Sequence, residues 1–68
     1  MNKYTYYKVL QLNYGQGWED TCQYPCNSQG VMLGEDRKEL RDDLTAYADN
    51  QPEYARRVIR RKELNVTN

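Results

Sequence analysis

The segment that most constrains the fold is one amphipathic helix, which we expect over residues 35–50 (EDRKELRDDLTAYADN). Glu35 and Asp36 lie in its first turn, where the helix dipole favours negative charge, and Asn50 and Pro52 stop it. Leu40, Leu44 and Tyr47, with Leu33 just before the helix, recur at helical spacing and form a single stripe. A charged helix with one apolar stripe packs against one surface on one side, so the remaining chain must supply that surface.

The segment before the first glycine pair predicts a strand. Residues 4–14 (YTYYKVLQLNY) are rich in aromatic and β-branched residues, which favour extended backbone. Alternation places Leu10 and Leu12 on the more apolar face, which we expect to look at the core. The other face carries Tyr7 and Val9 and is only partly polar, which is typical of a central strand.

A β-hairpin follows from the turn chemistry of the next residues. Gly15 and Gly17 can adopt the positive φ values that a tight reversal needs. We expect the second strand from about Trp18 to Tyr24, with alternate residues on one face: Trp18, Asp20, Cys22 and Tyr24. Pro25 lacks a backbone donor, so it should end this strand or hold it at an edge of the sheet.

The chain becomes extended again after the helix, and residues 54–64 (YARRVIRRKEL) are expected to form the last strand. Val58 and Ile59 point to opposite faces, so the pattern leaves open which face is buried. Together the elements predict a single small domain over residues 1–68, with an α+β fold in the order β-β-α-β. We expect a three-stranded antiparallel sheet in the order 2-1-3, with one helix packed on one face.

Composition excludes several classes of function. Ten basic and ten acidic residues give a formal net charge of zero, which argues against long-range attraction to nucleic acid or to anionic membranes. The chain has no His and no recognisable nucleophile pattern, so we expect that it is not an enzyme and uses no catalytic residue, cofactor or metal. No apolar run has the length of a membrane span, and the N-terminus lacks the apolar stretch of a signal peptide, so we expect a cytoplasmic location and no membrane partner.

The two cysteines are spaced C-x3-C. Without further Cys or His residues, Cys22 and Cys26 cannot complete a four-ligand zinc site within one chain. On a straight strand their sulfur atoms would lie roughly 13 Å apart, too far to bond. We expect two free thiols in a reducing compartment, the alternative being a turn at Pro25 that brings them together.

The uncovered side of the predicted sheet is the first candidate site. One helix shields only one side, and the other would expose Tyr7, Val9 and one row of arginines. Large aromatic side chains and Arg are the usual anchors of protein interfaces. We therefore expect this face to bind a host protein, or a second copy of the chain as a homodimer, through four residues: Tyr7, Trp18, Arg57 and Arg61.

The basic segment ARRVIRRK, residues 55–62, supports an alternative function. Arg forks bind phosphate well, and nearby Tyr rings can stack on bases. The nucleic-acid-binding residues would be Arg56, Arg57, Arg60, Arg61 and Lys62. Against this alternative, the helix carries six acids and three bases, so we expect helix and basic strand to be neighbours that partly neutralise each other. A structural or assembly component is a third alternative.

Three stretches together carry a resemblance: YYKVLQLNYGQGWED, the helix end LTAYADNQPEY, and the terminal ARRVIRRKEL. In these the chain resembles short uncharacterised proteins of bacteriophages and of mobile elements of enteric and gut bacteria. The resemblance covers most of the chain and brings no catalytic motif with it. It implies a small accessory protein made inside a bacterial cell, of a kind that often binds and blocks a host protein, including defence systems such as CRISPR.

Overall fold

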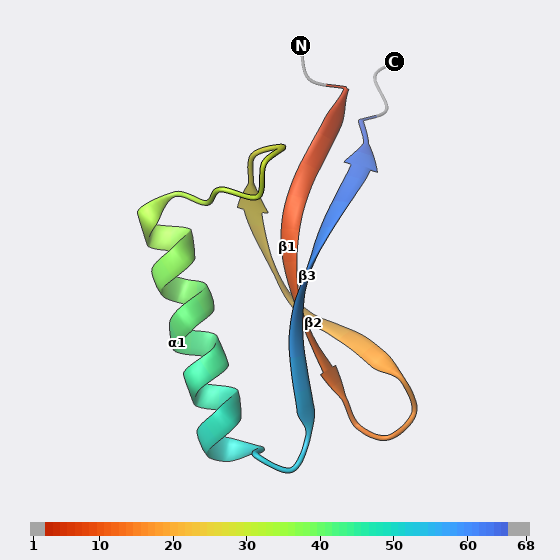
Figure 1. The fold of residues 1–68 in the computed structure, drawn as a ribbon, viewed down its shortest axis with the longest axis vertical. Helices are drawn as coiled ribbons and strands as arrows, with labels where there is room; N and C mark the ends of the chain where they lie inside the picture. The colour runs from red at the N-terminus through yellow and green to blue at the C-terminus, as the bar shows by residue number, and fades with distance from the viewer. Residues whose placement is uncertain (1–2, 66–68) are drawn as a thin grey trace.

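The computed structural model describes residues 3–65 and contains three strands and one helix (Figure 1). In chain order these are β1 (Tyr4–Asn13), β2 (Trp18–Cys26), α1 (Gly34–Asn50) and β3 (Ala55–Leu64). The strands form one antiparallel sheet in the order β2-β1-β3. The predicted α+β fold, its β-β-α-β order and its sheet order are therefore confirmed.

The central strand β1 is buried on both faces. Val9, Leu10 and Leu12 are fully buried, and Gln11 between them is only 5% exposed. Leu10 and Leu12 look toward the helix side, as expected from the alternation, whereas Val9 and Gln11 look to the opposite side. The expectation that Val9 lies on an open face is wrong, because that face is covered at its centre by the protein's own side chains.

The β1–β2 hairpin turns where the glycine pair predicts. Gly15 and Gly17 have φ values of 102° and 109°, in a region that L-residues with a Cβ seldom adopt. The Asn13 side chain accepts a hydrogen bond from the Gly15 backbone N–H at 2.8 Å, which fixes the start of the turn. Strand β2 then continues through Pro25 to Cys26, two residues beyond the prediction. Pro25 is tolerated because β2 is an edge strand and has a neighbour on one side only.

A β-bulge in β2 changes which residues share a face. Cys22 lies opposite Leu10, but the next β1 residue, Gln11, lies opposite Asp20, so Thr21 is an extra residue in the ladder. Thr21 stays satisfied because its hydroxyl donates a hydrogen bond to the Leu10 carbonyl oxygen at 2.9 Å.

The prediction that Trp18, Asp20, Cys22 and Tyr24 share one face is therefore wrong. Cys22 and Tyr24 lie on the helix side of the sheet, and Trp18 and Asp20 lie on the opposite side. The physical reason is that one inserted residue shifts the two-residue alternation of a strand by one position.

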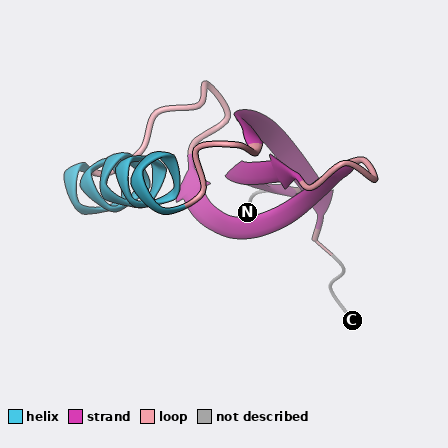
Figure 2. Ribbon diagram, turned by 90° about the horizontal axis from the view of Figure 1, so that it is seen from below, coloured by secondary structure: helices cyan, strands magenta, loops and turns pink. Residues whose placement is uncertain are grey.

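Helix α1 packs on one face of the sheet, at the β2 side, and does not extend across to β3 (Figures 1 and 2). The core under it consists of Leu10, Tyr24, Met32 and Leu40. The Tyr24 hydroxyl donates a hydrogen bond to an Asp43 carboxylate oxygen at 2.5 Å, and burial together with this bond raises the pKa of the Tyr24 hydroxyl. Within residues 3–65, no helix is both long and apolar enough to cross a membrane.

Candidate functional site

The alternation of β3 distributes the basic segment over both faces of the sheet. Arg57 pairs with Gln11 and Arg61 with Tyr7, which places both side chains away from the helix. Three other cations pair with residues whose side chains lie on the helix side: Arg56, Arg60 and Lys62. The five residues predicted to bind nucleic acid therefore do not form one strip but two separate groups.

The group on the far side of the sheet is held in an internal hydrogen-bond network. Arg57 Nε donates to Gln11 Oε1 at 2.8 Å, and Gln11 Nε2 donates to Asp20 Oδ1 at 2.7 Å. Arg61 donates to both Asp20 oxygens, at 2.5 Å and 3.3 Å. These hydrogen bonds, first from Arg61 and then from Gln11, hold the pKa of Asp20 below its usual value.

This network explains why Val9 is buried although no helix covers it. Arg61 lies opposite Tyr7, and Asp20 lies opposite Gln11, so the ion pair between them spans the position of Val9. The long apolar stem of an arginine can cover such a site while its guanidinium reaches the carboxylate. The far face is thus closed by polar side chains, without a second layer of backbone.

The four residues predicted to bind a protein partner do lie on this face. The Arg57 guanidinium stacks on the Trp18 ring at 4.2 Å from its centroid, and the Trp18 residue remains 37% exposed. Tyr7 in β1 is half-buried, and it lies opposite Arg61 in β3 and opposite Pro25 in β2. Three of the four residues are therefore engaged in contacts within the chain: Trp18, Arg57 and Arg61.

The helix-side group has a different environment. Among residues 3–65 the one ion pair joins Arg61 to Asp20, so Arg56, Arg60 and Lys62 have no carboxylate at salt-bridge distance. The expectation that the acidic helix neutralises the basic strand is wrong at ion-pair distance, since within residues 3–65 no helix carboxylate is paired with a cation of β3. The reason is topological: α1 packs at the β2 edge, and β3 is at the other edge of the sheet.

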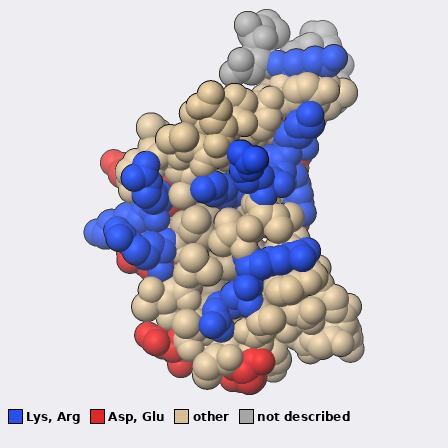
Figure 3. All heavy atoms as spheres, in the orientation of Figure 1, with Lys and Arg blue, Asp and Glu red and all other residues tan. Residues whose placement is uncertain are grey.

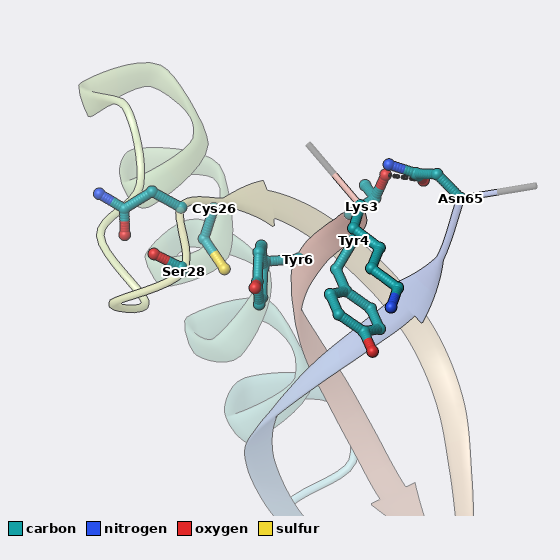
Figure 4. Close-up of a pocket in the computed structure, with 8 residues that line it drawn as sticks. Lys3, Tyr4, Tyr6, Cys26, Ser28 and Asn65 are labelled. Carbon is teal, nitrogen blue, oxygen red and sulfur yellow. Dashed lines mark hydrogen bonds between the residues drawn. The ribbon is translucent and has the colours of Figure 1, made fainter. Parts of the chain in front are cut away.

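Two adjoining hollows lie on this side, between the first half of β1, the end of β3 and the loop after β2. The first has a volume of about 510 Å³ and is lined by Lys3, Tyr4, Thr5, Tyr6, Cys26, Asn27, Ser28 and Asn65 (Figure 4). The second has a volume of about 370 Å³ and is lined by Tyr6, Tyr7, Cys26, Asn27, Ser28, Arg60, Arg61 and Lys62. These lining residues, all from the described part of the chain, are cationic, aromatic or neutral polar, and none is a carboxylate.

Two tyrosines form the aromatic part of the first hollow. The Tyr4 and Tyr6 ring centroids are 6.4 Å apart, with the rings tilted by 53°. In Figure 4 the Tyr6 ring lies between the Cys26 side chain and Tyr4, and the Lys3 side chain extends beside Tyr4. Two ammonium groups lie over the Tyr4 ring, that of Lys62 at 4.6 Å and that of Lys3 at 5.8 Å from its centroid.

Sequence reasoning assigned Tyr4 and Tyr6 to the core face and did not include Lys3 in any site. The face was correct, but both tyrosines are only half-buried because the helix does not reach this end of β1. The sequence signal for this aromatic and cationic site was the YTYY segment directly after Lys3. Its meaning depends on the pairing of Tyr6 with Lys62 in β3, which brings a second lysine to the tyrosines.

A buried glycine positions Arg60 at the second hollow. Gly30 has φ +81°, and a Cβ built on it would lie 2.9 Å from Arg60 Cδ and 3.1 Å from Arg60 Nη1. The Arg60 side chain therefore rests directly on the Gly30 backbone. Asn27 shapes this loop, since its side-chain oxygen accepts hydrogen bonds from the backbone N–H groups of Gln29 and Val31, at 2.8 Å and 2.9 Å.

The distribution of charge on the surface is uneven. In Figure 3 the Lys and Arg side chains gather across the middle and upper right of the face shown, with a further group at its left margin. The Asp and Glu side chains appear at the lower margin and beside the cations at the left margin. A net charge of zero therefore does not mean an evenly mixed surface. In so small a molecule, this local cationic area acts mainly at short range, because salt screens exposed charges beyond about 8–10 Å.

Two chemical alternatives from the sequence can be compared with the structure. Cys22 and Cys26 are not bonded to each other, as expected for residues on a continuous strand. Among the residues that the structure describes, no three His, Cys, Asp or Glu side chains come together in a way that could hold a metal ion.

The chain matches no protein-family model, and neither curated proteins nor solved structures provide a significant match to it. The resemblance to phage and mobile-element proteins stays a prediction.

Proposed function

We propose that this protein binds single-stranded nucleic acid on the helix side of its sheet. The single observation that carries the proposal is that, within residues 3–65, Arg60 and Lys62 have no carboxylate partner while two half-buried tyrosines, Tyr4 and Tyr6, lie beside them. Unpaired cations on one face are available to phosphates, and counterion release then drives binding. The arginines on the other face are already engaged in the Asp20 network.

A single strand fits this surface better than a duplex. Aromatic rings in or beside a cationic groove are the usual platform for unpaired bases, whose faces are accessible only when they are not stacked in a helix. The aromatic part of this surface consists of two neighbouring tyrosines, Tyr4 and Tyr6, at 6.4 Å between ring centroids. The zero net charge favours a weak, salt-sensitive complex without long-range steering.

The test is a titration of labelled single-stranded and duplex oligonucleotides, followed by fluorescence anisotropy at several salt concentrations. The double variant R60A/K62A removes one Arg and one Lys from the hollow, and K38A/R41A removes the same two charges from exposed positions on the helix. We expect R60A/K62A to weaken binding and to reduce the salt slope by roughly 0.7 for each phosphate that the protein no longer neutralises. K38A/R41A should bind like the unmodified protein.

Absence of binding at low salt would remove the proposal. Equal losses in the two double variants would also contradict it, because the effect would then be one of overall charge and not of this surface.

A second candidate function is binding of a protein partner through the far face of the sheet. The observation in its favour is the exposed Trp18 ring held in place by Arg57 at 4.2 Å, since rigid aromatic side chains next to Arg are frequent anchors of interfaces. This is the surface at which we expect, from the sequence, a host protein to bind.

Affinity capture from bacterial lysate with nuclease present separates the two candidates. A partner held by the far face should be retained after nuclease treatment, lost in Trp18→Ala, and kept in R60A/K62A. Capture that disappears with nuclease or with R60A/K62A would assign it to the nucleic-acid surface instead.

A further inference from the structure

We infer that the two adjoining hollows together accept one nucleotide unit of the bound strand, with its base in the first hollow against Tyr6 and its phosphate in the second against Arg60 and Lys62. This inference rests on the proposed function and specifies the ligand of that same site. It adds a base pocket and a phosphate pocket to what would otherwise be a general cationic surface.

The size and the division of the lining support this assignment. The hollows measure about 510 Å³ and 370 Å³ and share one wall, formed by Tyr6 and residues 26–28. Each lies within the range of about 300–1,000 Å³ that small-ligand sites occupy. The shared residues place the two hollows next to each other, so that one ligand of nucleotide size can contact both.

The chemistry of the two hollows differs in the way a nucleotide requires. The first is lined by two tyrosine rings, by Lys3 and Cys26, and by neutral polar side chains: Thr5, Asn27, Ser28 and Asn65. The rings and the neutral polar groups suit the flat, hydrogen-bonding surface of a base. The second is lined by Arg60, Arg61 and Lys62, which suit a phosphate. Arg61 is already paired with Asp20, so Arg60 and Lys62 are the two cations that remain for the ligand.

The two tyrosines have distinct roles. Tyr4 carries the ammonium groups of Lys62 and Lys3 over its ring and is therefore a positioning residue for these cations. Within residues 3–65, no Lys or Arg lies over the Tyr6 ring, and the Tyr6 hydroxyl makes no hydrogen bond. Tyr6 thus supplies the ring face on which a base can stack.

The experiment uses mononucleotides, which contain one base and one phosphate. A nucleoside 5′-monophosphate, the corresponding nucleoside, and ribose 5-phosphate are titrated into the protein, and NMR shifts of the backbone amides report binding. We expect the monophosphate to bind at least about tenfold more tightly than either fragment, because only it fills both hollows. The shifts should centre on residues 4–6, 26–28 and 60–62.

Variants test which hollow binds the base and which binds the phosphate. Tyr6→Leu should weaken monophosphate binding about 5- to 150-fold, which corresponds to the loss of one base–aromatic stack, and Tyr6→Phe should restore it because the ring is retained. Tyr14→Leu, a matched change of an exposed tyrosine at the hairpin end, should have no effect. R60A/K62A should abolish the advantage of the monophosphate over the nucleoside.

The failure of this inference is distinguishable from the failure of the proposed function. If oligonucleotides bind and depend on Arg60 and Lys62 but Tyr6→Leu binds them unchanged, the base pocket is overturned and the proposed function remains. Equal affinity for the monophosphate and ribose 5-phosphate would also overturn the base pocket. If the unmodified protein binds neither oligonucleotides nor mononucleotides, both are overturned.

Discussion

The two faces of the sheet use the same kind of residue for different purposes. On the far face, Arg57 is hydrogen-bonded to Gln11, and Arg61 is paired with Asp20 across the position of Val9. On the helix side, Arg60 and Lys62 line a hollow whose described walls include no carboxylate. These four cations come from six consecutive residues of one strand. Charge in the sequence therefore does not indicate function until each side chain has been assigned to a face and its partners are known.

The difference has an energetic side as well. Arg57 stabilises the fold because it donates a hydrogen bond to Gln11, a buried polar side chain. Arg61, paired with Asp20, stabilises it by shielding Val9 from water. Arg60 and Lys62 on the helix side satisfy no buried polar side chain and have no carboxylate partner among the described residues. We therefore expect mutations of the far face to change folding and mutations of the hollow to change binding.

The largest effects should come from the two neighbouring β1 residues that look to opposite faces. Leu10→Ala should lower the free energy of unfolding by about 2–5 kcal/mol, because it leaves a cavity under the helix. Val9→Ala should lower it by about 2 kcal/mol, since two buried methyl groups are removed under the Arg61–Asp20 pair.

Urea unfolding followed by circular dichroism gives both values. Val31→Ala is the matched control, because Val31 is 53% exposed and its truncation should cost less than about 0.5 kcal/mol. If Val9→Ala costs no more than this control, the far face is not a buried layer.

Gln11 provides the next effect, because it joins Arg57 to Asp20. Gln11→Ala removes both hydrogen bonds of a side chain that is only 5% exposed, and we expect a loss of about 1–3 kcal/mol in unfolding free energy. Gln23→Ala, an exposed glutamine of the same sheet, should change stability by less than about 0.5 kcal/mol. Oligonucleotide binding by folded Gln11→Ala protein should be unchanged, and a loss there would mean that the two faces are not independent.

A substitution of Gly30 tests the hollow on the helix side of the sheet, and we expect it to have a smaller effect on stability. Gly30→Ala should cost about 1–2 kcal/mol, because a residue with a Cβ is strained at φ +81°. The new methyl group would also displace the Arg60 side chain, so nucleotide binding should fall in the folded protein. Gly34→Ala is the control, since it has open space around it and should be neutral or slightly stabilising. Unchanged binding by Gly30→Ala would show that the rest position of Arg60 does not matter.

Acidification should give the smallest change. The pKa of Asp20 in the folded protein is below its ordinary value of 3.8, so its ion pair contributes stability above that pH and loses it as the pH falls through the folded pKa. The stability advantage of the unmodified protein over Asp20→Asn should therefore be present at about pH 6 and shrink toward about pH 3. Glu19→Gln, in the same hairpin but without an ion pair among the described residues, should show no such convergence. An advantage that is constant with pH would contradict the ion pair.

Local signals were sufficient to predict most of the architecture. Gly15 and Gly17 predicted the hairpin because few residues other than glycine adopt their φ values readily, and the helix ends at Asn50 as its stop signals indicate. The bulge at Thr21 was not predictable in the same way. It arises from the register of two strands, and the sequence of β2 alone contains no signal for the extra residue.

The candidate site was only partly predictable for the same reason. Arg60 and Lys62 were included among five basic residues, but no local pattern separates them from Arg57 and Arg61. Tyr6 was assigned to the core face, and its partial exposure depends on how far the helix extends across the sheet.

The amino-acid sequence by itself determined which elements form and in what order, because turn residues and hydrophobic periodicity act over a few neighbouring positions. Only the tertiary structure decided which arginines are hydrogen-bonded to Gln11 and Asp20 and which face the hollow. That choice depends on the pairing of β3 with β1, the bulge that places Asp20 beneath Arg61, and the position of the helix at the β2 edge. Each of these depends on distant parts of the chain coming together. The sequence of β3 has cations on both of its faces, so only its pairing with β1 decides on which side of the sheet each cation lies.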